Sequence, residues 1–228
     1  MFLKILFSVG IEAIEQETAA QSSCDLWFLE RVCRLTASKI KSVITRRCDF
    51  QGLVQQLLYK EPPTHLPALH WGRMNEPKAV EMYEQKFPGR SVSKCGLVIH
   101  PTHKFIAASP DRRVHDPAFT PPHGLLEVKC PVATLELPEV AAGVKKGFCL
   151  QRTDDGKVAL DRSHAYYYQV MGQLFCSGRS WCDFVVMCGG GIFVERIQYD
   201  AEFWEACLRK LKSFYMDYLL KELACPHH

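Results

Sequence analysis

The sequence has no Cys-x-x-Cys pair, no phosphate-binding loop and no long apolar run, and each absence excludes a class of protein. Its eleven cysteines are scattered singly, so the paired unit of a zinc ribbon is missing. Gly189-Gly190-Gly191 is not followed by Lys and Ser or Thr, which excludes a P-loop at this position. No stretch approaches the roughly 18 apolar residues of a membrane span. We therefore expect reduced cysteines in an intracellular protein that has no membrane partner.

Length and charge set broad limits on the fold and on the partner. At 228 residues and 47% hydrophobic content, the chain suits one domain with a full core. Its net charge of +3 permits a polyanionic partner without demanding one. The apolar start, Met1 to Gly10, is interrupted by Lys4 and followed by three glutamates, so we do not expect a signal peptide. We predict an N-terminal extension over 1–20, a main domain over 21–223 and a short tail over 224–228.

One stretch, from Ser109 to Cys130, combines acidic and basic residues in a pattern that suits a catalytic site. Ser109-Pro110-Asp111 is followed by a proline-rich loop and then by a strand-like run that begins at Leu125. Because side chains alternate between the two faces of a strand, Glu127 and Lys129 lie on the same face. The pattern therefore predicts an acid and an ammonium group side by side, with Asp111 brought in from a neighbouring strand.

Two carboxylates beside a lysine are typical of hydrolysis assisted by a divalent cation. Mg²⁺ prefers oxygen ligands and keeps several waters, so one or two carboxylates and the oxygens of a phosphate suffice to bind it. A cation held there lowers the pKa of a bound water and stabilises charge on a phosphate under attack. Lys129 would orient that water, help to deprotonate it or neutralise the phosphate. A solvated Glu–Lys pair on an exposed strand is the alternative that this motif alone leaves open.

The remaining pattern predicts a single α/β domain with a mixed central sheet flanked by helices. Strands are expected near 91–100, 105–111, 125–130, 182–188 and 192–198. Helices are expected near 12–32, 39–46, 50–58, 69–86, 138–146, 163–175 and 201–223, with a hairpin over 148–160. The segment 112–123, with its three prolines, is expected to be a loop. Pro77 indicates a kink or a new first turn within the helix 69–86.

Three further blocks accompany the Ser109 to Cys130 stretch in a fixed order along the chain. They run from Trp27 to Ser38, from His70 to Glu76 and from Tyr166 to Gln173. Together the four blocks closely resemble the YqaJ/lambda-exonuclease-like family of viral recombination nucleases, within the PD-(D/E)XK superfamily. The resemblance covers roughly residues 21–220, and four ordered blocks are far more specific than any one of them.

The resemblance implies a PD-(D/E)XK core and a set of catalytic residues in this chain. Asp111 and Glu127 would hold Mg²⁺ or Mn²⁺, as two ions, with the backbone carbonyl of Val128 as a further ligand. Glu76 would reach the metal directly or through water, although an exposed helix glutamate is the alternative. Lys129 would position the attacking water, and Gln169 would lie next to these groups.

The resemblance also implies residues that bind the DNA and its terminal 5′ phosphate. These are Arg31, Arg34 and Ser38, because the block from Trp27 to Ser38 performs this function in the family. Thr36-Ala37-Ser38 also predicts the start of a helix, whose exposed amides attract anions. A simple helix cap by Ser38 and an ion pair of Arg31 with a nearby acid are the alternatives.

The implied activity is digestion of one strand of linear double-stranded DNA from its 5′ end, in recombination or end processing. A strand-annealing protein and a ring-shaped homo-oligomer are implied partners. Two other classes of function stay open, namely an endonuclease or RNA-cutting nuclease of the same superfamily, and a DNA-binding module that has lost catalysis. Nuclear and cytoplasmic placement fit the sequence equally well.

Overall fold

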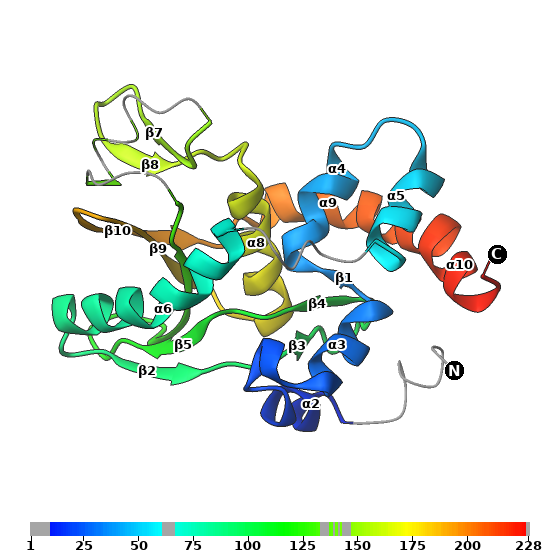
Figure 1. The fold of residues 1–228 in the computed structure, drawn as a ribbon, viewed down its shortest axis with the longest axis horizontal. Coiled ribbons are helices and arrows are strands. Elements are labelled where there is room, and N and C mark those ends of the chain that lie inside the picture. The colour runs from blue at the N-terminus through cyan, green and yellow to red at the C-terminus, as the bar shows by residue number, and fades with distance from the viewer. Residues whose placement is uncertain are drawn as a thin grey trace.

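The computed structural model describes residues 10–60, 67–132, 137, 138, 140, 142 and 147–226 and has a mixed α/β architecture (Figure 1). Its larger sheet has the strand order β10-β9-β6-β5-β2, in which the β6–β9 pair is parallel and the other pairs are antiparallel. These strands are β2 (Ser91–Lys94), β5 (Arg112–His115), β6 (His123–Lys129), β9 (Trp181–Cys188) and β10 (Gly191–Gln198). The predicted fold class, with a mixed sheet flanked by helices, is confirmed.

A three-stranded sheet and a hairpin complete the β-structure of the described residues. The small sheet has the order β1-β4-β3, with β1 (Leu35–Thr36), β4 (Ile106–Ala108) and β3 (Val98–Ile99). The hairpin pairs β7 (Leu150–Arg152) with β8 (Val158–Leu160), as the Asp-Gly turn predicted. The predicted helix 138–146 falls largely on residues outside those that the structure describes.

Helices cover both faces of the larger sheet and gather at one end of the molecule. They are α2 (Ile11–Glu17), η1 (Gln21–Ser23), α3 (Asp25–Val32), η2 (Ala37–Lys39), α4 (Ile40–Ile44), α5 (Phe50–Leu58), α6 (Pro67–Lys86), α8 (Ala165–Ser177), α9 (Ala201–Phe214), η3 (Tyr215–Leu219) and α10 (Leu220–Ala224). Helices α4, α5, α9 and α10 group together on the right of Figure 1. None of the helices in the described ranges is both long enough and apolar enough to cross a bilayer.

Strand β6 is central because apolar layers cover it on both sides. Leu125 belongs to a cluster with Val170 of α8, whereas Leu126 belongs to a second cluster with Val80 of α6. Since alternate residues face opposite sides, Glu127 shares the α8 side with Leu125. Helix α8 therefore lies over the face of β6 that carries the predicted catalytic residues.

Helix α8 also lies in close contact with the segment that follows β1. A Cβ built on Gly172 would come within 2.4 Å of Ile40 Cδ1 and 3.2 Å of Ala37 Cβ. Helix α8 is therefore closely packed here, and a larger residue at position 172 would require the Ile40 side chain to move. The approach brings η2, which contains Ser38, next to the same face of β6.

The predicted single strand over 91–100 is wrong, because this segment is divided between the two sheets. Strand β2 pairs with β5, and β3 pairs with β4. Helix α2 crosses between them at Gly96, where an added Cβ would lie 2.0 Å from the carbonyl oxygen of Glu15. Ile14 of the same helix is 1% exposed and packs on Ile99. The range 1–20 therefore includes a helix that packs into the core.

Four other predictions about individual elements are corrected or narrowed by the structure. The expected loop 112–123 begins with β5, whose only buried residue is Val114, so the strand has little apolar signal. The expected helix 12–32 is three separate helical segments, and the expected helix 201–223 contains a π-helical turn at Tyr215–Leu219. Helix α6 continues through Pro77 and does not restart there.

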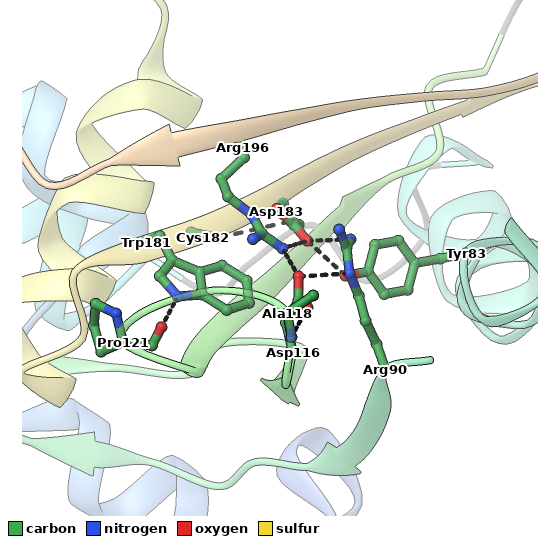
Figure 2. A network of polar contacts seen from close by, with 9 residues as sticks. All are labelled: Tyr83, Arg90, Asp116, Ala118, Pro121, Trp181, Cys182, Asp183 and Arg196. Carbon is green, nitrogen blue, oxygen red and sulfur yellow. Dashed lines mark hydrogen bonds and ion pairs between the residues drawn. The ribbon is translucent and has the colours of Figure 1, made fainter. Parts of the chain in front are cut away.

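A buried charge network supports the α6 side of the larger sheet (Figure 2). Asp183 of β9 is 1% exposed and accepts hydrogen bonds from Arg196 Nε at 2.7 Å, Arg90 Nη1 at 2.9 Å and the Tyr83 hydroxyl at 2.6 Å. Asp116 accepts from Arg196 Nη2 and pairs with Arg90 Nε, both at 2.9 Å. Burial raises the pKa of Asp116, but the two arginines outweigh this effect and lower it. The network links α6, β9, β10 and the end of β5.

We predict that Asp183→Asn lowers the free energy of unfolding by about 3 kcal/mol, because it leaves two buried guanidinium groups with one carboxylate. Urea denaturation would measure the change, with Asp155→Asn in the exposed β7–β8 turn as the control that leaves stability unchanged. The contribution of Asp116 is present above about pH 4 and is lost as the pH falls through its lowered pKa. A wild-type stability in Asp183→Asn would contradict the role of the network.

Candidate active site

Glu127 lies at the centre of a set of hydrogen-bond donors on the α8 face of β6. It is 1% exposed, and its Oε1 accepts from Lys129 Nζ at 2.5 Å, which matches the predicted placement on one strand face. Gln169 Nε2 also donates to Oε1, at 2.5 Å, and Gln173 Nε2 donates to Oε2 at 2.6 Å. A buried carboxylate is costly without such partners. Three donors therefore hold this one in a defined orientation.

Asp111 joins this group from the connection between β4 and β5. Its Oδ2 accepts a hydrogen bond from the backbone amide of Val128 at 2.7 Å, so it lies against β6 beside Glu127. Burial, and then the charge of Glu127, raise the pKa of Asp111 well above its usual range. Burial alone would lower the pKa of Lys129, but Glu127 and Asp111 outweigh it and raise it. Lys129 is thus an ammonium group between two acids.

Glu76 lies near this group but is turned towards a different partner. Its Oε1 is 2.9 Å from Arg112 Nη1, which also donates to the backbone carbonyl of Asp111. Its charge contributes to the raised pKa of Asp111. Across the described ranges, no three His, Cys, Asp or Glu side chains gather closely enough to hold a metal ion. The contact of Glu76 with a metal stays a prediction.

The donor set formed by Asp111 and Glu127 fits a divalent cation. Both residues offer carboxylate oxygens, the ligands that Mg²⁺ and Mn²⁺ prefer. Their mutual repulsion is visible in the raised pKa of Asp111, and a cation between them would remove it. The buried Oε1 of Gln173 has no hydrogen-bond partner within the described structure. The site therefore contains a hydrogen-bond acceptor that no side chain of the site satisfies.

A small cavity connects this group to Arg31. It has a volume of about 170 Å³ and is lined by Gln21, Trp27, Arg31, Thr36, Ala37, Ser38, Ser109, Asp111, Glu127, Lys129, Gln169 and Gln173. The Arg31 guanidinium stacks on the Trp27 ring at 3.8 Å and donates to Ser109 Oγ at 3.3 Å. Burial lowers the pKa of Arg31 to about 10, with no carboxylate acting on it. The guanidinium stays charged at neutral pH and has no counter-ion among the described side chains.

Ser38 lines the same cavity, although not as a helix cap. Its Oγ lies 3.5 Å from Thr36 Oγ1, and neither side chain caps a helix. The predicted helix 39–46 is limited to α4, a five-residue helix that follows the 3₁₀ turn η2. The serine is therefore placed by the turn and not by a long helix N-terminus.

The structure does not bring Arg34 to this cavity, which corrects its predicted contact with phosphate. Its Nη1 pairs with Glu30 Oε2 at 2.6 Å, and its Nε donates to the Lys104 carbonyl at 3.0 Å. Both side chains of the Arg34–Glu30 pair are almost completely buried. Arg34 is three positions after Arg31, a spacing that would place both on one side of a continuous helix, but α3 ends at Val32 between them. The two arginines therefore face different surroundings.

Sequence reasoning assigned no role to several residues that the structure places in or against the cavity. Gln173 is four residues after Gln169, so helix periodicity was a signal that could have found it. Tyr166 is three residues before Gln169, and Lys129 Nζ lies 4.7 Å from the centre of its ring. Gln21 donates to the carbonyl of Pro110 at 2.9 Å and so supports the loop that carries Asp111. No local signal in the sequence indicates that last contact.

Asp111 from the connection before β5, with Glu127 and Lys129 from β6, has the arrangement of two acids and a lysine that is expected of a PD-(D/E)XK nuclease site. The chain matches the model of the YqaJ-like viral recombinase domain over residues 26–180 and belongs to this family. It is therefore a nuclease of the YqaJ and alkaline exonuclease type, as the four sequence blocks predicted. A comparison with curated protein sequences gives no match.

Solved structures support the same assignment. The alkaline exonuclease LHK-Exo from Laribacter hongkongensis is 26% identical, with 87% of this chain and 93% of that chain covered and a TM-score of 0.65. LHK-Exo in complex with dAMP is 25% identical, with coverage of 92% and 94% and the same TM-score. The Shutoff and Exonuclease Protein of Kaposi's sarcoma-associated herpesvirus has a TM-score of 0.58 at 12% identity, covering 90% of this chain and 71% of that chain. This last similarity concerns the fold alone.

We predict that Arg34→Ala lowers the free energy of unfolding by about 3 to 5 kcal/mol, because it leaves Glu30 charged, buried and unpaired. Thermal or urea denaturation would measure the loss. Arg209→Ala, at an exposed position on α9, is the matched control and should leave stability nearly unchanged. If Arg34→Ala were as stable as the control, the buried pair would not have the role that its geometry indicates.

Proposed function

We propose that the chain is a divalent-metal-dependent exodeoxyribonuclease that digests one strand of linear double-stranded DNA from its 5′ end, in recombination or end processing. The observation that carries this proposal is the uncompensated Arg31 guanidinium in the same small cavity as Glu127 and Lys129. A buried cation without a counter-ion favours an anionic ligand, and phosphate suits a guanidinium especially well.

The size of the cavity suits one phosphate group. About 170 Å³ corresponds to roughly five or six water molecules, which is enough for a phosphate. Arg31 and the Ser38 hydroxyl would bind the terminal 5′ phosphate, with Trp27 holding the guanidinium in place. One nucleotide strand would enter at a time, and cleavage would proceed from that end.

Asp111 and Glu127 would hold Mg²⁺ or Mn²⁺, as two ions, with the Val128 carbonyl as a further ligand and Glu76 joining directly or through water. When bound, the metal would supply an activated water and charge neutralisation at the phosphate. Lys129 would donate hydrogen bonds to the attacking water or to a phosphate oxygen, as an ammonium group held in a fixed position by Glu127. Gln169 would fix Glu127 Oε1 between this lysine and the cavity.

Relatives with known ligands support nucleic acid as the partner. Structural neighbours include LHK-Exo with dAMP and, at the level of fold, a SOX–DNA complex and a Kaposi's sarcoma-associated herpesvirus SOX–RNA complex. The proposal includes two further expectations of the family, a ring-shaped homo-oligomer and a strand-annealing partner. A ring would keep the enzyme on one duplex, and the partner would take over the 3′ strand that digestion exposes.

We predict magnesium-dependent loss of a 5′ label from linear duplex DNA, abolished by EDTA, with covalently closed circles left intact. Glu127→Gln and Lys129→Ala should each lower the cleavage rate by more than about 100-fold while DNA binding is retained, because each removes one charge from the site. Glu81→Gln, at an exposed position of α6, is the control.

Three other outcomes would contradict this prediction. Nicking of the circles would indicate an endonuclease, and faster cutting of RNA than of DNA would indicate an RNA-cutting nuclease. Binding without cleavage would indicate a decayed enzyme.

We further predict that Arg31→Ala reduces the preference for 5′-phosphorylated over 5′-hydroxyl ends by roughly 10- to 100-fold, because a charge-assisted contact is lost. The measurement compares initial rates on the two substrates for the wild type, Arg31→Ala and the surface control Arg209→Ala. The same ratio in all three proteins would remove Arg31 from phosphate recognition and leave the metal-dependent cleavage unaffected.

A further inference from the structure

Gln173 makes a contact in the active site that the reaction outlined above does not use. Its side chain is 0% exposed, and its Nε2 is 2.6 Å from Glu127 Oε2. Gln169, one turn earlier on α8, donates to the other oxygen, Oε1, which also accepts from Lys129. The two oxygens of Glu127 are therefore held by different donors, and Oε2 depends on Gln173.

The amide of Gln173 has one reasonable orientation. The reversed amide would place Oε1 against a carboxylate oxygen, so the donor must face Glu127. In the observed orientation Oε1 is buried and has no hydrogen-bond partner among the described residues. An unpaired buried acceptor costs free energy, whereas a hydrogen bond to a charged group is stronger than one between neutral groups. The hydrogen bond to Glu127 therefore determines the orientation of the Gln173 amide.

The helix that carries Gln173 is fixed against the opposite wall of the cavity. Its neighbour Gly172 packs on the segment after β1, where a Cβ would lie 2.4 Å from Ile40 Cδ1 of α4 and 3.2 Å from Ala37 Cβ of η2. Ser177 Oγ donates back to the Gln173 carbonyl at 2.8 Å in the last turn of α8. Because α8 is closely packed here, the length of the Gln173 side chain helps to set where Glu127 Oε2 lies.

We infer that Gln173 is a positioning residue that anchors Glu127 Oε2, so that the carboxylate presents its remaining lone pairs to a divalent cation. This inference rests on the metal-dependent function proposed above. Partners of this kind orient a ligand before the metal arrives, and their removal typically weakens metal binding or activity by 10- to 100-fold. Gln173 acts through Glu127 and does not touch the substrate.

The test measures Mn²⁺ binding to the full chain without DNA, by the loss of the free-ion electron paramagnetic resonance signal. Gln173→Met keeps the length of the side chain and removes the donor, and we expect its Mn²⁺ affinity to fall by roughly 10- to 100-fold. Cys176→Ala, another buried change on α8, is the control for general packing effects and should bind Mn²⁺ as the wild type does. Circular dichroism and thermal melting establish that each variant is folded.

A second variant and a second measurement keep the test decisive. Gln173→Leu also removes the donor and keeps an apolar side chain of similar volume, so we expect it to weaken Mn²⁺ binding as much as Gln173→Met does. In cleavage assays, the magnesium concentration for half-maximal rate should rise in both variants, whereas a merely misfolded fraction would lower the maximal rate alone. Equal Mn²⁺ affinity in wild type and folded Gln173 variants would overturn the inference. An absence of Mn²⁺ binding in the wild type would overturn the metal assignment itself, and the inference with it.

Discussion

The burial of one carboxylate, Glu127, is the constraint on which the site depends. A charged group at the centre of a sheet is costly unless donors surround it, and this one has an ammonium group and two amides within hydrogen-bonding distance. Lys129 comes from the same strand, but both amides come from α8. The packing of α8 on the sheet is therefore also what completes the site, and anything that moves the helix changes the environment of the acid.

The opposite face of the sheet also contains a buried carboxylate, Asp183, which has different hydrogen-bond partners. Asp183 on β9 pairs with Leu126, the residue before Glu127 on β6. Its side chain is buried to the same extent as that of Glu127. There two arginines and a tyrosine satisfy the acid fully (Figure 2). With the arginines and Asp116, this network is balanced in charge, and none of its members lines the cavity beside Glu127. One buried acid is thus structural and the other is accessible from a cavity, although both strands are neighbours in one sheet.

Much of this arrangement could be predicted from the sequence, where local rules apply. Alternation along a strand placed Glu127 and Lys129 together, and the local pattern predicted the helix that became α8, whereas the place of Gln169 in the site was implied by the family resemblance. The errors arose where distant segments decide the outcome. Helix α2 packs against the expected strand 91–100 at Gly96 and divides it. No pattern in the sequence around Gly96 indicates that this helix packs there. Strand β5 has one buried residue, so its place in the sheet comes from pairing with β2 and β6 and not from its own composition.

The pair Arg31 and Arg34 shows the same limit at the level of a single side chain. Both arginines lie in one block of the sequence, and both were predicted to contact phosphate. Glu30 is four residues before Arg34, so an i, i+4 ion pair was visible in the sequence. Nothing in the sequence indicated that this pair would be buried, because its burial depends on the distant Lys104 segment.

The charges around the cavity explain why the difference between the two arginines matters. When Asp111 and Glu127 are ionised, their two negative charges match those of Lys129 and Arg31. On the proposed function, metal at the two carboxylates would oppose their negative charge, and a terminal phosphate of charge near −2 would oppose the two cationic side chains. Because both sets of charges line one small cavity, the binding of either ligand should strengthen the binding of the other. Joint binding of metal and strand end would then favour cleavage of DNA that is already correctly seated.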